Sequence, residues 1–199
     1  DDLSYPERLR KQVTFMDQNH AVGVCGTYAW LAGEDGIPVY MYRHASDHGS
    51  LEKNLLAGAN AMTHGSVLMR SDVLRELDPV YRFRYGQDYD LWLRLLRVTQ
   101  FALIPEGLYL YRRSSQSISS RVQGMRAEMI NLMLALEGER RETGDEYTSW
   151  QDAEAWVLKK HDQRHRRMPG TGGPRYVQPY LKLLRGTQLG ALQDLWNGR

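Results

Sequence analysis

The pattern that most constrains the fold of this chain is a strand–turn–strand segment over residues 21–43. The part up to Leu31 is rich in Val, Tyr and Trp with glycine breaks, which favours a strand. Glu34-Asp35-Gly36 is typical of a tight turn, and residues 37–42 have the character of a returning strand. The segment therefore predicts a β-hairpin.

Helical patterns surround this hairpin and predict a mixed α/β fold. Apolar residues recur at helical spacing in several segments; these are residues 5–18, 49–57, 88–97, 122–142, 150–160 and 179–196. Ser4-x-x-Glu7 has the pattern of a capping box for the first helix. Further short strands are predicted at three places: residues 66–69, 101–104 and 108–111. We expect an α/β unit at 1–121 and a helical extension at 122–199, with a Gly/Pro-rich linker near 168–174.

Composition excludes several classes of protein. The 199 residues include 26 Lys+Arg, 24 Asp+Glu and one Cys. This near balance of charge gives no reason to expect nucleic-acid binding. The lone Cys25 excludes an intramolecular disulfide and a Cys-rich zinc site. No apolar run approaches the roughly 20 residues that span a bilayer, so we expect a cytoplasmic protein.

Two acidic segments are candidates for chemistry. Asp1 and Asp2 precede the first predicted helix, where two carboxylates either bind a hard divalent cation or form a solvated chain end. Asp88 and Asp90 begin an apolar helix after an Arg-rich stretch. A carboxylate in that place either acts as a general base or caps the helix.

Two further segments combine basic and small residues. His64 stands before Gly65 and a predicted strand, where it either lines a substrate pocket or is a hydrogen-bonded structural histidine. Arg112 and Arg113 precede the hydroxyl-rich segment 114–119. Guanidinium groups there either make bidentate contacts to phosphate or belong to a polar surface loop.

Taken in this order, the segments resemble those of family 2 glycosyltransferases, which are inverting enzymes of the GT-A fold. The matching phrases are DDLSYPERLRKQV at 1–13, VGVCGT at 22–27, EDG at 34–36, HGSVLMR at 64–70, YRFRYGQDYDLWLR at 81–94, and YRR at 111–113 with SIS at 117–119. The phrase QDYDLWLR is the most specific of them. The resemblance covers residues 1 to about 121.

The resemblance implies a role for several residues. Asp1 would bind Mg²⁺ or Mn²⁺, which bridges the donor diphosphate, and Asp2 would support that site or touch the donor sugar. Asp88 matches the catalytic base that deprotonates the acceptor hydroxyl. Arg112 would lie near the diphosphate.

Other positions belong to the acceptor side or depart from the family pattern. His64, Gln87 and Asp90 would line the acceptor side, and Gln87 stands where many members have Glu. Ser114 occupies a position where many members have His, and a serine is the poorer ligand for metal or phosphate.

The implied reaction moves a sugar from a nucleotide-sugar, most simply a UDP-sugar, to an acceptor hydroxyl with inversion. The acceptor would be a saccharide or a lipid-linked acceptor in polysaccharide or glycoconjugate synthesis. In the family, the nucleotide-binding half precedes an Asp-x-Asp-Asp phrase, and Asp1 and Asp2 match the last two acids of that phrase. The resemblance therefore implies an incomplete GT-A fold that lacks its N-terminal half and is inactive alone.

The helical extension carries a basic cluster at residues 159–167. Such a cluster either contacts an anionic membrane surface, here the inner face of the membrane, or forms a solvated helix face. An alternative function is a non-catalytic membrane- or partner-binding module derived from a glycosyltransferase. No nucleic-acid recognition motif accompanies the cluster.

Overall fold

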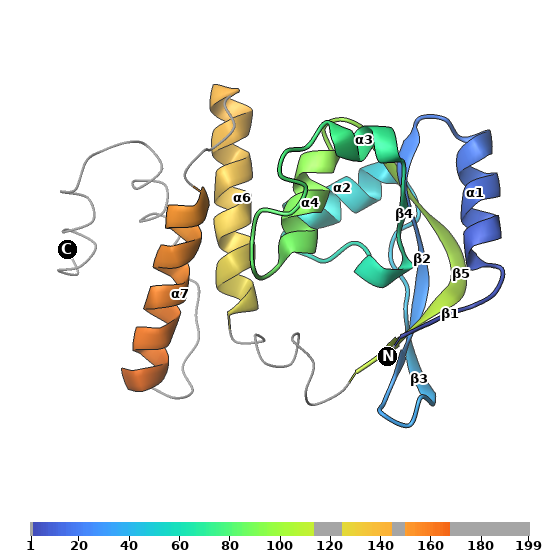
Figure 1. Cartoon of the computed structure of the whole chain (residues 1–199), viewed down its shortest axis with the longest axis horizontal. Coiled ribbons are helices and arrows are strands. Elements are labelled where there is room, and N and C mark those ends of the chain that lie inside the picture. The colour runs from blue at the N-terminus through green and yellow to red at the C-terminus, as the bar shows by residue number, and fades with distance from the viewer. Residues whose placement is uncertain (1, 114–124, 145–149, 168–199) are drawn as a thin grey trace. The chain divides into compact units, whose positions relative to one another are not determined.

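The computed structural model describes residues 2–113, 125–144 and 150–167, and the chain divides into two compact units. The first unit takes in residues 1–81 and 91–121, and the second takes in residues 82–90 and 122–199. A sheet with helices makes up the first unit (Figure 1), which confirms the predicted mixed α/β class. The domain boundary after residue 121 stays a prediction.

Strand β2 (Val22–Ala32) is the centre of the sheet, whose order is β1-β5-β2-β3. β5 (Gln100–Arg112) runs parallel to β2, and β1 (Leu3–Ser4) adds to β5 in the antiparallel direction. On its other edge β2 pairs antiparallel with β4 (Leu68–Met69) near its beginning and with β3 (Pro38–Tyr42) near its end. The pairing of β2 with β3 confirms the predicted hairpin.

The prediction of two short strands at 101–104 and 108–111 is wrong, because β5 is one strand. Thr27 of β2 pairs with Ile104, whereas the next residue, Tyr28, pairs with Gly107. The shift in register leaves Pro105 and Glu106 in a bulge. A bulge tolerates proline inside a strand because no ladder hydrogen bond is required of its nitrogen.

Helices α1 (Arg8–Gln18), α2 (His48–Leu56) and α4 (Gln87–Leu95) confirm three of the predicted helices. The predicted capping box is wrong. Glu7 is the N-cap of α1 and no side chain caps the helix, while Ser4 lies in β1 and its Oγ accepts a hydrogen bond from Arg8 Nε at 2.7 Å. Ser4 does not cap the helix because it pairs with Tyr109 of β5.

The predicted buried strand at 66–69 is a short 3₁₀ helix, η1 (His64–Ser66), followed by the half-buried strand β4. The Ser66 hydroxyl donates to Thr27 O at 3.2 Å and accepts from Thr27 N at 3.5 Å. The Ser66 side chain thus hydrogen-bonds to the Thr27 backbone, in the part of β2 that lies between its pairings with β4 and with β3. α3 (Ser71–Arg75) follows, with Arg70 as its N-cap.

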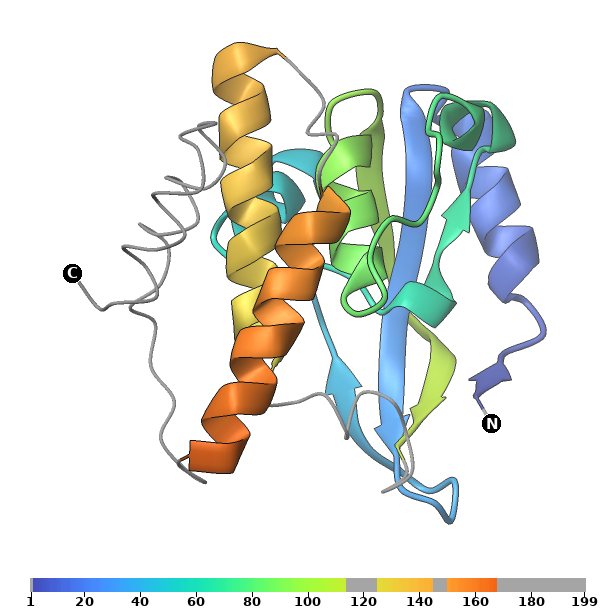
Figure 2. The ribbon, with the colours of Figure 1, turned by 60° about the vertical axis from the view of Figure 1, so that its left-hand side comes forward.

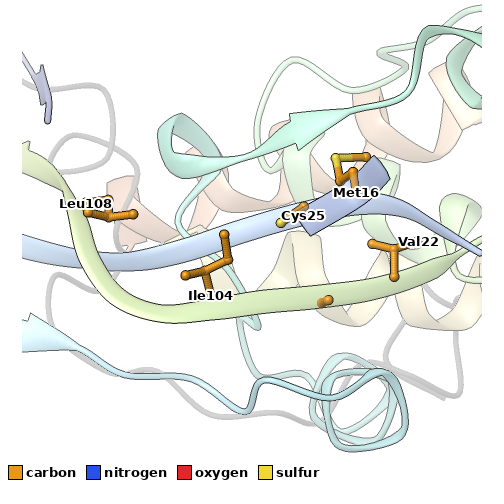
Figure 3. Close-up of a cluster of buried hydrophobic side chains, with 6 residues drawn as sticks. Met16, Val22, Cys25, Ile104 and Leu108 are labelled. Atoms are coloured by element: carbon orange, nitrogen blue, oxygen red, sulfur yellow. The ribbon is translucent and has the colours of Figure 1, made fainter. Parts of the chain in front are cut away.

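The core lies on both faces of the sheet because successive residues of β5 point to opposite sides. On the α1 side, buried apolar side chains form one cluster (Figure 3); they are Met16, Val22, Cys25, Ala102, Ile104 and Leu108. Phe101 belongs to the opposite side, where its ring lies 6.2 Å from those of His48 and Trp92.

In the second unit, helices α6 (Arg126–Thr143) and α7 (Trp150–Arg167) lie side by side (Figures 1 and 2). The apolar side chains that recur at helical spacing along the predicted helical segment 122–142 are buried; they include Met125, Met129, Met133 and Leu136. The ring of Phe83 lies 5.4 Å from that of Trp150. The predicted helix 179–196 and linker 168–174 lie outside the described residues. No helix in the described ranges is long and apolar enough to cross a bilayer.

Candidate functional site

The carboxylate of Asp2 is the centre of a hydrogen-bonded site at the end of β5. Its Oδ2 accepts from the Tyr109 hydroxyl at 2.7 Å, and its Oδ1 accepts from the backbone nitrogen of Arg112 at 2.8 Å. β1 places Asp2 there because Leu3 and Ser4 pair with Leu110 and Tyr109 of β5. An exposed residue near the start of the chain is thus fixed in position by a strand about one hundred residues away.

Tyr109 reaches Asp2 because the residue beside its hydroxyl is a glycine. A Cβ atom added to Gly65 would lie 2.0 Å from Tyr109 Oη, far inside van der Waals contact. Burial raises the pKa of the Tyr109 phenol, and its hydrogen bond to the Asp2 carboxylate raises that pKa further. The phenol therefore stays a proton donor to Asp2 at neutral pH.

Side chains of α1 contact Tyr109 and link it to neighbouring elements. The guanidinium of Arg8 lies over the Tyr109 ring, 5.6 Å from its centroid, and Arg8 Nη1 donates to Gln12 Oε1 at 3.1 Å. The buried Gln12 amide donates to the carbonyl oxygens of Cys25 at 2.6 Å and Ser66 at 2.9 Å. Gln12 thereby links α1 to β2 and to η1.

Arg112 presents its guanidinium toward the β2–β3 turn. A Cβ atom added to Gly36 would lie 3.3 Å from Arg112 Nη2, and Gly36 has a positive φ of 76°. The Nε atom of Arg112 is buried and has no hydrogen-bond partner in the described structure. The side chain predicted to meet phosphate thus lies beside the β2–β3 turn and has one donor, Nε, with no partner among the described residues.

His64 lies in a cluster of aromatic rings. Its Nε2 is 3.1 Å from Tyr81 Oη, and its ring meets that of Trp92 edge-on with centroids 5.6 Å apart. Trp92 is fully buried, as expected for a core residue, and its indole nitrogen has no hydrogen-bond partner in the described structure. His64 therefore combines a structural contact with partial exposure.

Asp88 and Asp90 differ in what surrounds their carboxylates. Asp90 is buried and bound by Arg82, whose Nη2 and Nε donate to its two oxygens at 2.5 Å and 3.1 Å. Asp88, in the first turn of α4, is half-buried, and no ion pair or hydrogen bond within the described ranges engages its carboxylate. Gln87 beside it is exposed. Asp90 is thus held in an ion pair with Arg82, while the Asp88 carboxylate has no described partner.

The metal role assigned to Asp1 lies outside the described residues, as do Ser114 and the segment 114–119. Across residues 2–113, 125–144 and 150–167, no three His, Cys, Asp or Glu side chains come together as metal ligands. Both oxygens of Asp2 already accept hydrogen bonds. Each oxygen keeps a further lone pair, so the supporting role and the contact to the donor sugar both stay predictions for Asp2.

Sequence reasoning missed Tyr109, Arg8 and Gln12. Tyr109 was predicted as part of a strand but not as a partner of Asp2, because a two-residue strand such as β1 leaves no periodic pattern. The His64-Gly65 step was the available signal. A glycine beside a candidate site residue indicates that another group approaches its backbone closely.

Comparisons with known proteins define the class to which this site is similar. No protein-family model matches the chain. EpsE of Bacillus subtilis (strain 168), whose name is "putative glycosyltransferase", is 33% identical over 126 residues, which is 61% of this chain and 44% of EpsE. The O-antigen biosynthesis glycosyltransferase WbnJ of Escherichia coli is 32% identical over 96 residues, 48% of this chain and 37% of WbnJ.

A third relative has the same character. The amylovoran biosynthesis glycosyltransferase AmsE of Erwinia amylovora is 25% identical over 122 residues, 61% of this chain and 45% of AmsE. The chain spans less than half the length of these relatives. It is therefore similar to curated glycosyltransferases over about half to three fifths of its own length.

Proposed function

We propose that this chain is the acceptor-side part of a family 2 glycosyltransferase of the GT-A fold. The reaction moves a sugar from a UDP-sugar donor to a hydroxyl of a saccharide or lipid-linked acceptor. The configuration of the anomeric carbon inverts in the transfer. The similarity to relatives named for O-antigen and amylovoran biosynthesis supports this class of reaction. It also supports a place in polysaccharide or glycoconjugate synthesis.

The observation that carries the proposal is the contrast between Asp88 and Asp90. A general base needs a carboxylate that is ionised, positioned and not already bound to a cation. Asp90 fails the last condition because Arg82 binds both of its oxygens. Asp88, two residues earlier on α4, meets this condition because no described cation binds its carboxylate.

In this mechanism Asp88 accepts the proton of the acceptor hydroxyl. The hydroxyl oxygen forms a bond to the anomeric carbon as the bond between that carbon and the diphosphate oxygen breaks. The nucleoside diphosphate leaves with the electron pair. Because attack and departure occur on opposite faces of the sugar, the anomeric configuration inverts.

Asp2 and Arg112 would act on the donor. The Asp2 carboxylate would accept a hydrogen bond from a donor-sugar hydroxyl or support the metal site. The Arg112 guanidinium would bind the diphosphate, and its unused Nε donor supports this role. Asp1 would hold Mg²⁺ or Mn²⁺, which stabilises the charge that develops on a leaving diphosphate.

The proposal extends to the place where the enzyme works. The basic segment 159–167 would contact an anionic membrane surface, which would bring a lipid-linked acceptor within reach. Its composition, with seven Lys, Arg and His residues in nine positions, supports this assignment; the residues are Lys159, Lys160, His161, Arg164, His165, Arg166 and Arg167.

Asp88→Asn tests the catalytic assignment. The protein, at its natural full length, is incubated with Mn²⁺ and UDP-glucose, UDP-galactose or UDP-N-acetylglucosamine, and the release of UDP is measured. We expect Asp88→Asn to lower the rate by about 100-fold or more. The control is Asp17→Asn, an exposed carboxylate at the end of α1. Full activity in Asp88→Asn would overturn the assignment of the base.

A further inference from the structure

Tyrosines line one face of the sheet in two rows that cross from β3 to β5. Direct strand partners project from the same face of a sheet. Leu31 of β2 pairs with Tyr40 of β3 and with Tyr111 of β5. Ala29 of β2 pairs with Tyr42 and with Tyr109 in the same way. Four tyrosines therefore share one face at the end of the sheet that carries Asp2.

The outer two tyrosines form an open corner. Tyr40 is 57% exposed and Tyr42 is half-buried. Their ring centroids are 5.3 Å apart and their planes stand at 81° to each other. Tyr42 also stacks on the ring of His44, with centroids 6.4 Å apart and planes within 12°. The Tyr42 ring thus stacks on His44, and the Tyr40 ring stands nearly perpendicular beside it.

The corner lies on the same face of the sheet as Tyr109, whose ring is buried. Tyr42 and Tyr109 flank the same residue, Ala29, so they lie two strand spacings apart, about 10 Å. Tyr109 in turn donates its hydroxyl proton to the Asp2 carboxylate.

We propose that Tyr40 and Tyr42 form a subsite that binds a pyranose ring of the acceptor. This inference rests on the proposed function. A pyranose has an apolar face of C–H groups and a rim of hydroxyls. An aromatic ring with a phenolic hydroxyl matches both parts, since it stacks on the face and hydrogen-bonds to the rim.

The geometry favours a sugar over the nucleobase of the donor. A planar base binds best between parallel rings, whereas the Tyr40 and Tyr42 rings are nearly perpendicular. The exposure of Tyr40 also leaves the corner open to solvent, so a saccharide chain can continue beyond it. Acceptors in polysaccharide synthesis have that form.

Binding of oligosaccharides to the full-length protein tests the subsite. The probes are cellotetraose, chitotetraose, maltotetraose and mannotetraose, each titrated by saturation-transfer NMR. We expect at least one to bind, and Tyr40→Ala and Tyr42→Ala each to weaken that binding by about tenfold, as for removal of an aromatic contact. Tyr42→Phe keeps the ring and should retain most of the affinity.

Val39→Ala is the matched control, because Val39 is 70% exposed on the neighbouring position of β3 and points to the opposite face. Circular dichroism verifies that each variant is folded. No binding of any probe, or equal binding by Tyr40→Ala and the unaltered protein, overturns the subsite. Weaker UDP binding in Tyr40→Ala, with oligosaccharide binding intact, would overturn it in favour of the nucleobase.

The subsite and the proposed function fail separately. Asp88→Asn is expected to bind oligosaccharide normally while it loses transfer. Binding that depends on Tyr40, together with full transfer by Asp88→Asn, would refute the base and leave the subsite in place. Loss of transfer in Asp88→Asn, together with unchanged binding in both tyrosine variants, would refute the subsite alone.

Discussion

The hydroxyl of Tyr109 donates a 2.7 Å hydrogen bond to Asp2 Oδ2 and so joins two residues that are 107 positions apart in the chain. The second oxygen of the same carboxylate accepts from the backbone of Arg112. With the short ladder between β1 and β5, these bonds hold the beginning of the described chain on the sheet.

Tyr109→Phe removes the hydroxyl and leaves the ring under Arg8. We expect the free energy of unfolding to fall by about 1 kcal/mol, the usual value of one hydrogen bond, and UDP release by the full-length protein to fall as Asp2 loses its position. Urea denaturation measures the first effect. Tyr5→Phe, at an exposed tyrosine, is the control, and an equal loss in both variants would contradict the role of the Tyr109 hydroxyl.

Asp90→Asn should destabilise the protein much more than Asp88→Asn. The substitution leaves the buried Arg82 guanidinium without its carboxylate, which typically costs about 3 kcal/mol or more. Asp88→Asn breaks no described contact, so its unfolding free energy should stay within about 0.5 kcal/mol. Chemical denaturation of both variants measures the difference, and similar stabilities would show that Asp90 does not carry the ion pair in solution.

Gly65→Ala should disturb the Asp2 site without a change in any charged group. The new Cβ would collide with Tyr109 Oη, so we expect a loss of about 1–3 kcal/mol from overpacking. The loss should shrink in a Tyr109→Ala background, where the colliding atoms are absent. Thermal unfolding of the single and double variants gives the coupling, and additive effects would argue against this contact.

Gly49→Ala serves as the matched control for that experiment. Gly49 lies in α2, and an added Cβ would be 3.7 Å from its nearest neighbour atom, an ordinary contact. Alanine is the better helix former, so this variant should gain about 0.5–1 kcal/mol.

Cys25 should make stability depend on pH in the alkaline range. Burial raises the pKa of its thiol from 9.0 to about 11. Between these values the unfolded thiol loses its proton first, so the native state binds more protons and its stability falls as pH rises. Below about pH 9 both states are protonated and the thiol contributes no pH dependence.

The measurement is the difference in unfolding free energy between the unaltered protein and Cys25→Ala at about pH 8 and about pH 10.5. Substitution adds a constant offset, and the pH-dependent part should reach at most about 1.4 kcal/mol per pH unit. A difference that is the same at both pH values would indicate that the thiol has an ordinary pKa in the native state.

Local patterns predicted much of the fold. The Glu34-Asp35-Gly36 turn and the Val-rich segment before it were enough for the hairpin, because turn chemistry and strand composition act over a few residues. The apolar positions of α4 and α6 likewise followed from spacing. β5 was divided wrongly because Pro105 and Gly107 usually end strands, and only the long partner β2 permits a bulge there.

Long-range pairing explains what sequence left open at the candidate site. Nothing in the sequence around Leu3 and Ser4 indicates that they pair with β5, so the partners of Asp2 were not predicted. Asp88 and Asp90 carry the same side chain two positions apart, and the sequence offered both for the acceptor side. Arg82, placed by the segment before α4, distinguishes them by binding one of the two.

The two edges of β2 carry different groups of side chains, which can be substituted separately. The edge toward β5 holds the Asp2 carboxylate, and the edge toward β3 carries the Tyr40–Tyr42 corner. Substitutions about 10 Å apart that share no partner have nearly additive effects. Substitutions at Tyr40 and at Asp2 should therefore change stability nearly independently, whereas exchange of the whole hairpin would also replace Gly36, which adjoins Arg112.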